Sequence, residues 1–155
     1  MIKKATGILL AAMSLSGCCG GDLAGNPDED KKHIVEAIMG MYQAFQQADL
    51  PKVGKYMTDD STCYDATTSV LLKGRKAVLD HFGAILAQHK PGEAWESSIE
   101  GMTVALQGNM AYATYQVRTS AGGMHATAAV THVFRRSGEV WLAVHLHRSW
   151  NLQPK

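Results

Sequence analysis

The sequence predicts a single α+β domain, in which helices pack on one face of a curved antiparallel sheet. Two observations lead to this fold class. Apolar residues recur at helical spacing in the first half of the chain, and after Trp95 they alternate with polar residues. Turn residues separate the alternating stretches, which is typical of a meander of hairpins. Helices first and strands afterwards is the order expected of an α+β domain.

The helical half contains three expected helices. The first has one apolar face and ends near Ala48; the apolar residues of this face are Ile34, Ile38, Met41, Tyr42 and Phe45. Asp49-Leu50-Pro51 supplies a cap and a first-turn proline for a second, short helix. Residues 61–64 form a candidate strand, and Gly74 precedes a third helix. The apolar stripe of that helix consists of Val78, Phe82, Ile85 and Leu86.

The strand half is expected to form four antiparallel strands, over residues 102–106, 110–118, 124–136 and 140–150. In the last strand, strict alternation places Trp141, Ala143, His145, His147 and Ser149 on one face and Val140, Leu142, Val144 and Leu146 on the other. Both faces are largely apolar near the start of this strand, and helices cover only one of them. We therefore predict that the second face is a subunit interface in a homodimer or a higher homo-oligomer.

The N-terminus has the composition of a secretory signal. Lys3 and Lys4 precede an apolar run that is too short to span a bilayer as a mature helix. The run ends in Leu15-Ser16-Gly17-Cys18, which resembles the lipobox of bacterial lipoproteins. This resemblance implies that residues 1–17 are removed and that a lipid on Cys18 anchors the chain to a membrane. The alternative is an ordinary signal peptide.

Cys19 follows the lipobox, in place of the aspartate that typically retains such lipoproteins in the inner membrane. The expected location is therefore the bacterial cell envelope, on the outer membrane and facing the periplasm. Residues 18–32 are expected to form a flexible tether, because glycine, proline and acidic residues dominate them. The folded domain then spans residues 33–151.

The charge of the chain limits its partners. Loss of Lys3 and Lys4 with the signal changes the net charge from +1 to −1. A near-neutral chain without a basic run is not expected to bind nucleic acid. Cys63 is expected to be a small buried apolar residue.

The last strand has the form Trp-x-x-Val-His-x-His-x-Ser, and it follows three helices and a long meander. This arrangement resembles the nuclear transport factor 2-like, or SnoaL-like, superfamily. The chain is most similar to the association (hub) domain of calcium/calmodulin-dependent protein kinase II, over about residues 33–150. The matching motifs are Thr131-His132-Val133-Phe134, Arg135-Arg136 and Val144-His145-Leu146-His147-Arg148-Ser149. The resemblance implies a cone-shaped fold whose helices and curved sheet enclose a cleft.

In the hub domain this cleft is lined by arginines and can hold small carboxylates. By position, Arg148 keeps one of these arginines, whereas His132 and Val117 replace two others. The resemblance thus implies a less positive cleft in which Arg148 anchors an anion. His132 would add charge only near or below its pKa, normally about 6.5. Tyr42, Tyr115 and His147 complete the set of candidate ligand-binding residues.

Asp65 is the candidate catalytic residue. Residues 57–65 resemble the segment of ketosteroid isomerases whose last aspartate is the general base. A carboxylate in an apolar cone can have a raised pKa and can take a proton from a carbon acid. However, Met41 aligns with the oxyanion tyrosine of that family, so the largest catalytic contribution is missing. Asp65 is therefore a catalytic base, a residue that lines the pocket, or a turn residue.

His145 and His147 alternate on one strand, so strict alternation places both imidazoles on the same side. Two histidines are half of a metal site, and a third ligand would have to come from His125 or His132. The alternative is hydrogen bonding within the core or to a neighbouring subunit. We predict neither a metal site nor a cofactor.

Three hypotheses for the function follow. The first is a lipid-anchored domain that binds a small molecule, with a carboxylate as the candidate ligand; it requires Arg148 and His132 to face inward. The second is an enzyme of the isomerase, dehydratase or cyclase type that uses Asp65 as its base. The third is a structural oligomerisation module with an idle pocket. Enzymes and binding proteins share this scaffold, so the fold alone leaves open whether the chain is an enzyme.

Overall fold

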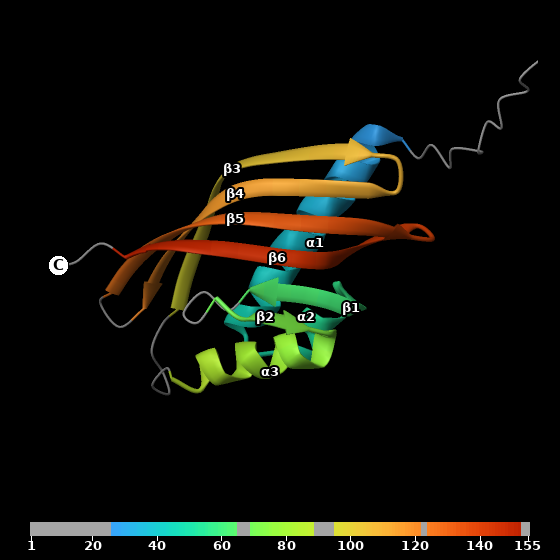
Figure 1. Cartoon of the computed structure of the whole chain (residues 1–155). Coiled ribbons are helices and arrows are strands. Elements are labelled where there is room, and N and C mark those ends of the chain that lie inside the picture. Colours follow the sequence, from blue (N-terminus) through green and yellow to red (C-terminus); the bar gives the residue numbers. More distant parts are fainter. Residues whose placement is uncertain (1–25, 65–68, 89–94, 122–123, 153–155) are drawn as a thin grey trace, which may run out of the picture.

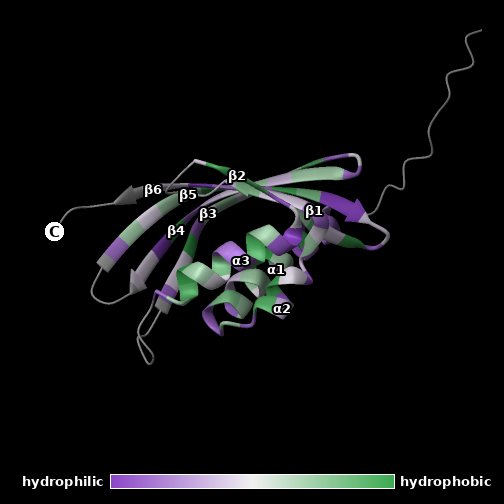
Figure 2. Ribbon diagram, turned by 60° about the horizontal axis from the view of Figure 1, so that its bottom comes forward, coloured by the Kyte–Doolittle hydropathy of each residue, from purple (hydrophilic) through white to green (hydrophobic). Residues whose placement is uncertain are grey.

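The computed structural model describes residues 26–64, 69–88, 95–121 and 124–152. Three helices lie on one side of a six-stranded sheet with the order β2-β1-β6-β5-β4-β3 (Figures 1 and 2). The elements are α1 (Pro27–Gln46), α2 (Leu50–Gly54), β1 (Met57–Tyr64), β2 (Leu71–Lys73), α3 (Arg75–Leu86), β3 (Trp95–Gln107), β4 (Met110–Ala121), β5 (Met124–Ser137) and β6 (Val140–Leu152). We call the face that packs against the helices the inner face and the opposite one the outer face.

The predicted α+β fold is confirmed: helices come first and a curved, open sheet covers them. Figure 1 shows β3, β4 and β5 bending around the helical layer. Irregular register in β3, between Glu100 and Thr103, coincides with Gly101 at φ +63°, and such a bulge bends a strand. Among the described residues, no helix combines the length and apolar composition needed to cross a bilayer.

Helix α1 begins at Pro27, before the predicted start of the folded domain at residue 33. The side chain of Asn26 accepts a hydrogen bond from the backbone N–H of Asp28 at 3.1 Å, and Pro27 occupies the first turn. Both features are strong helix-start signals. The predicted tether, residues 18–32, therefore overlaps the start of this helix.

Strand β1 is longer than the predicted 61–64, and β2 was not predicted at all. Three residues are too few to show a periodicity, so β2 becomes a strand only because it pairs with β1, for example Tyr64 with Leu71. Strand β1 also pairs in parallel with β6, the last strand. This pairing joins the first strand of the sheet to the last one in the chain and places β6 inside the sheet.

A β-bulge in β6 overturns the predicted faces of that strand. Val133 pairs with His145 and Phe134 pairs with Ala143, so Val144 is an extra residue without a partner in β5. One extra residue reverses the alternation of the side chains that follow it. Trp141 and Ala143 are buried before the bulge, and Leu146 is buried after it. His145 and His147 therefore lie on the outer face, and Arg148 lies on the inner face.

The core lies between the inner face and the helices. Its largest fully buried side chains include Phe134 from β5 together with Ile34 and Ile38 from α1. Cys63 is buried as expected, at 3% exposure. Figure 2 shows the apolar faces of the helices beneath the sheet. The core fills most of the space between these layers, and a cleft remains between the helices and the sheet.

Candidate ligand-binding cleft

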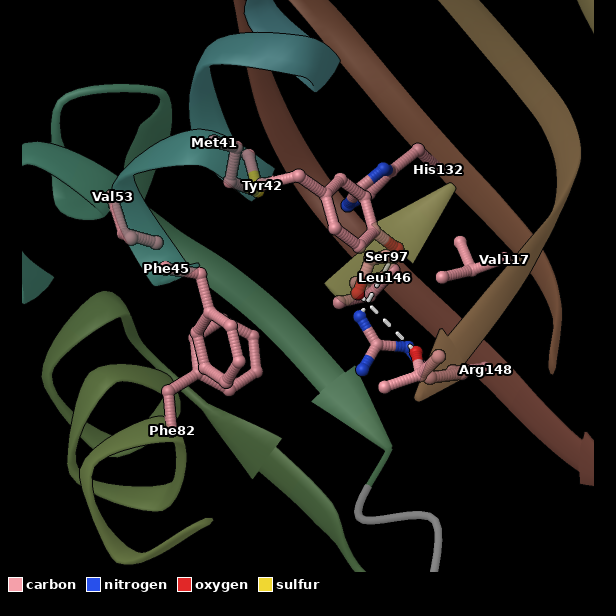
Figure 3. A pocket seen from close by; sticks show the side chains of 11 residues that line it. Met41, Tyr42, Phe45, Val53, Phe82, Ser97, Val117, His132, Leu146 and Arg148 are labelled. Atoms are coloured by element: carbon pink, nitrogen blue, oxygen red, sulfur yellow. Dashed lines mark hydrogen bonds between the residues drawn. The ribbon is translucent and has the colours of Figure 1, made fainter. Parts of the chain in front are cut away.

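The cleft lies between the helices and the inner face of the sheet (Figure 3). Its described lining consists of Met41, Tyr42, Phe45, Val53, Phe82, Ser97, Val117, Thr119, His132, Leu146 and Arg148. The space open to the centre of a water molecule is about 20 Å³, which is room for roughly one water. Side chains therefore nearly close the cleft, and a larger ligand requires some of them to move.

One end of the cleft is apolar and the other is polar. Phe45 and Phe82 pack edge to face, with ring centres 5.6 Å apart, and Val53 lies beside them. Figure 3 shows this pair on one side and Tyr42, His132 and Arg148 on the other. The cleft thus suits a molecule with an apolar body and one polar end.

Arg148 is the charged group of the cleft. Its Nη2 donates a hydrogen bond to the hydroxyl of Tyr42 at 3.1 Å. The guanidinium carbon lies 5.7 Å from the ring centre of Tyr42 and 5.3 Å from that of Trp150, so two aromatic faces hold it. Its Nε is buried and has no hydrogen-bond partner among the described residues.

Two acidic residues of the chain, Glu100 and Asp65, are candidate partners of Arg148. Glu100 forms an ion pair with Arg118 instead, at 3.0 Å, and Asp65 lies outside the described residues. Within the described part of the chain, no carboxylate forms an ion pair with Arg148. A half-buried cation without a counter-ion is costly for a fold, and an anionic ligand would offset that cost.

His132 is the buried histidine of the cleft, with 1% of its surface exposed. Its Nδ1 lies 2.7 Å from the hydroxyl of Tyr115. Burial lowers the pKa of His132 to about 3, and the nearby charges of Arg148 and His145 act in the same direction. The imidazole is therefore neutral at physiological pH. The hypothesis that His132 adjusts the charge of the cleft is wrong.

Tyr115 is buried behind His132 and is not among the residues that line the cleft. Burial raises the pKa of its hydroxyl, and the neighbouring Tyr42 raises it further. The rings of Tyr42 and Tyr115 pack edge to face at 6.1 Å. Tyr115 therefore stays protonated and acts as a hydrogen-bonding support for His132.

The depressed pKa of His132 predicts a loss of stability in acid. The unfolded chain binds a proton below about pH 6.5, whereas the folded chain does so only near pH 3. Stability is therefore complete above pH 6.5 and falls by about 1.4 kcal/mol per unit as the pH decreases below it. Between pH 7.5 and pH 5.0 this amounts to about 2 kcal/mol.

Urea denaturation at both pH values, on the wild type and on His132→Asn, measures this contribution. The variant retains an acceptor for Tyr115 and has no imidazole. The free energy of unfolding that it loses between the two pH values should therefore be smaller than the loss of the wild type, by about 2 kcal/mol. The other titrating groups, including His145, are common to both proteins. Equal losses would show that His132 is not held neutral by the fold.

His147 lies away from the cleft, because the bulge at Val144 turns it outward. It is exposed on the outer face, where the Tyr64 ring lies 5.7 Å from it and 5.8 Å from His145. The hydroxyl of Thr62 lies 2.8 Å from Nδ1 of His145. His132 is on the inner face and cannot join this pair. No group of three metal-binding side chains forms among the described residues.

Several residues that the sequence analysis named line the cleft, whereas its apolar end was not predicted. Arg148, His132 and Val117, the three positions carried over from the hub domain, all line one cleft, as does Tyr42. Phe45 and Phe82 were recognised only as helix stripes, because a stripe does not show which of its residues border an opening. Asp65, Cys18 and residues 1–17 lie outside the described residues.

The fold and the cleft define a small α+β domain in which helices and a curved sheet enclose a narrow, nearly closed cleft. The chain belongs to the SnoaL-like domain family, whose model matches residues 34–153. The predicted resemblance to SnoaL-like proteins is thereby confirmed. No curated protein sequence is significantly similar to the chain.

Solved structures share the fold at low sequence identity. A nuclear transport factor 2-like protein of unknown function from Pseudomonas putida has a TM-score of 0.72 and 22% identity, over 82% of this chain and 97% of that one. A candidate dehydratase of the same family from Streptomyces avermitilis has a TM-score of 0.73 and 20% identity, over 82% and 100%. The hub homology domain from Chlamydomonas reinhardtii has a TM-score of 0.66 and 18% identity, over 80% and 98%.

Proposed function

We propose that this chain is a small-molecule-binding domain whose cleft holds an apolar carboxylate, anchored by Arg148. The observation that carries the proposal is the buried, unpaired Nε of Arg148 in a cleft whose other end is apolar. An arginine offers parallel N–H donors that match the two oxygens of a carboxylate. Tyr42 and Trp150 hold the guanidinium in place before a ligand arrives, which reduces the entropy cost of binding.

A thermal-shift panel of small carboxylates and neutral cyclic ketones tests this proposal. A ligand at 100 times its dissociation constant stabilises the fold by about 2.7 kcal/mol. We expect apolar carboxylates to raise the Tm of the wild type and to have no effect on Arg148→Ala. Arg118→Ala is the matched control, because Arg118 lies on the outer face and pairs with Glu100. This control should respond like the wild type.

The panel also separates the proposal from its alternative. If only the ketones stabilise the protein, and Arg148→Ala responds equally, the carboxylate proposal is wrong. The enzyme hypothesis would then be preferred, and Asp65→Asn would be assayed for lost isomerase activity.

We further propose that the outer face is the interface of a homodimer. Its exposed large apolar side chains include Tyr112 at 51% and Val140 at 53%, and half-buried Val133 and Leu142 lie on the same face. We expect the wild type to sediment as a dimer and Tyr112→Lys to sediment as a monomer. Met39→Lys is the control, because Met39 is equally exposed, at 51%, but lies on α1. A monomeric wild type at micromolar concentration would contradict the proposal.

We also propose that a lipid on Cys18 anchors the domain to the outer membrane, facing the periplasm. The lipobox-like Leu15-Ser16-Gly17-Cys18 supports this proposal. Cys18→Ala is expected to abolish labelling with a radioactive fatty acid and to release the protein from the membrane fraction. Fatty-acid labelling that persists in Cys18→Ala would contradict it.

A further inference from the structure

His132 can present only one of its ring nitrogens to a ligand. A neutral imidazole has one N–H donor and one bare nitrogen acceptor. Nδ1 is engaged by the hydroxyl of Tyr115, so the ring nitrogen that remains for the cleft is Nε2. Whether Nε2 is a donor or an acceptor therefore depends on which residue, Tyr115 or His132, donates the hydrogen bond between them.

The geometry indicates that Tyr115 supplies it. The 2.7 Å separation is typical of a hydroxyl donor, whereas an N–H donor normally lies about 2.9–3.0 Å from its oxygen acceptor. A phenol is also a better donor than acceptor, and a neutral imidazole nitrogen is a good acceptor. With the hydroxyl of Tyr115 donating to Nδ1, the ring proton must be on Nε2.

Arg148 is a second donor at the polar end of the cleft. Arginine only donates, so the hydroxyl oxygen of Tyr42 accepts from Nη2 of Arg148. Arg148 and His132 then both offer N–H groups at the polar end of the cleft. Ser97 and Thr119, which also line the cleft, contribute hydroxyls 3.4 Å apart that can act as donor or acceptor. A ligand group placed between Arg148 and His132 meets donors on both sides.

We infer that His132 is a specificity-determining residue, and that its Nε2–H binds a neutral oxygen acceptor on the ligand. This inference rests on the proposed function, since Arg148 holds the carboxylate. The ligand class is then an apolar oxo acid, in which a carboxylate and a ketone oxygen share one apolar body. The Phe45 and Phe82 end of the cleft accommodates that body.

Isothermal titration with matched acids tests the inference. Three pairs differ only by a ketone in place of a methylene group: benzoylformate and phenylacetate, phenylpyruvate and hydrocinnamate, benzoylpropionate and phenylbutyrate. The ketone is adjacent to the carboxylate in the first two pairs, which differ in the distance to the ring, and it is separated from the carboxylate by two methylene groups in the third. In at least one pair, the oxo acid should bind the wild type about fivefold or more tightly than its partner, as expected for one added hydrogen bond.

His132→Leu should bind both members of that pair equally. Tyr115→Phe, which removes only the hydroxyl, should reduce the preference without abolishing it. A preference retained in full by His132→Leu, or none in the wild type for any pair, would overturn the inference and leave the proposed function intact. Failure of all six acids to bind the wild type would overturn the proposed function and the inference with it.

Long-range ¹H–¹⁵N NMR of the imidazole ring provides a test that needs no variant to fold. It distinguishes a protonated from a bare ring nitrogen in the wild type. We expect the proton of His132 on Nε2 in the free protein. A proton on Nδ1 would mean that Tyr115 accepts the hydrogen bond, that Nε2 is an acceptor, and that the inference is wrong.

Discussion

Replacement of Asp30 by alanine is expected to lower the free energy of unfolding by about 3–5 kcal/mol, because it leaves a buried arginine without its counter-ion. Asp30 lies in the first turn of α1 and is 7% exposed. It forms an ion pair with Arg136 and accepts a hydrogen bond from Nε1 of Trp141 at 3.0 Å. The guanidinium carbon of Arg136 also lies 4.8 Å from the centre of the Trp141 ring.

This cluster joins the start of α1 to the end of β5 and the start of β6. Nε of Arg136 is already without a hydrogen-bond partner among the described residues, so the arginine depends strongly on Asp30. Removal of both charges is less harmful than removal of one. The double variant Asp30→Ala/Arg136→Met should therefore recover part of the loss.

Urea denaturation of the wild type, the single variant and the double variant measures both changes in the free energy of unfolding. Asp59→Ala is a suitable control, because Asp59 also pairs with an arginine, Arg75, but is 87% exposed on its side chain. It should cost less than about 1 kcal/mol. If Asp30→Ala costs no more than this control, the buried cluster does not hold α1 to the sheet.

Arg148→Met is expected to make the ligand-free protein more stable, by about 1–2 kcal/mol. An unpaired buried charge is unfavourable, and this substitution removes such a charge, whereas Asp30→Ala creates one. Arg148 is a half-buried cation with a buried, unpaired Nε, and methionine fills similar space without a charge. The hydroxyl of Tyr42 loses one donor, which offsets part of the gain.

The same variant should gain nothing from apolar carboxylates, which raise the Tm of the wild type. A gain in stability together with a loss of binding is the signature of a residue retained for function. Arg118→Met serves as the control and should change stability by less than about 0.5 kcal/mol. A loss of stability in Arg148→Met would indicate that Arg148 is a structural residue with a counter-ion.

The fold could be predicted from the sequence because helical and strand periodicities occupy separate halves of the chain. The two faces of β6 could not be predicted, because a bulge at Val144 shifts the alternation. Neither Val144 nor its neighbour His145 is a residue type that indicates a turn. This single residue explains why His147 was assigned to the ligand site although it lies outside. It also places Arg148 on the inner face, where the proposed ligand requires it.

Three residues of the candidate site could be predicted because a resemblance supplied their positions. Arg148, His132 and Val117 line one cleft although they come from three different strands. The charge state of His132 could not be predicted, because the degree of burial that lowers its pKa depends on packing against distant elements. The near closure of the cleft depends on the same packing.

The most direct test of Arg148 as the ligand anchor is an NMR titration of the arginine Nε–H signals with hydrocinnamate. The signal of Arg148 is assigned by its absence in Arg148→Lys. We expect this signal to shift and saturate with the acid, because its unpaired Nε–H and the neighbouring Nη groups contact the carboxylate, while the signal of Arg118 stays in place. An Arg148 signal that does not move while the acid binds elsewhere on the protein would contradict the proposed function.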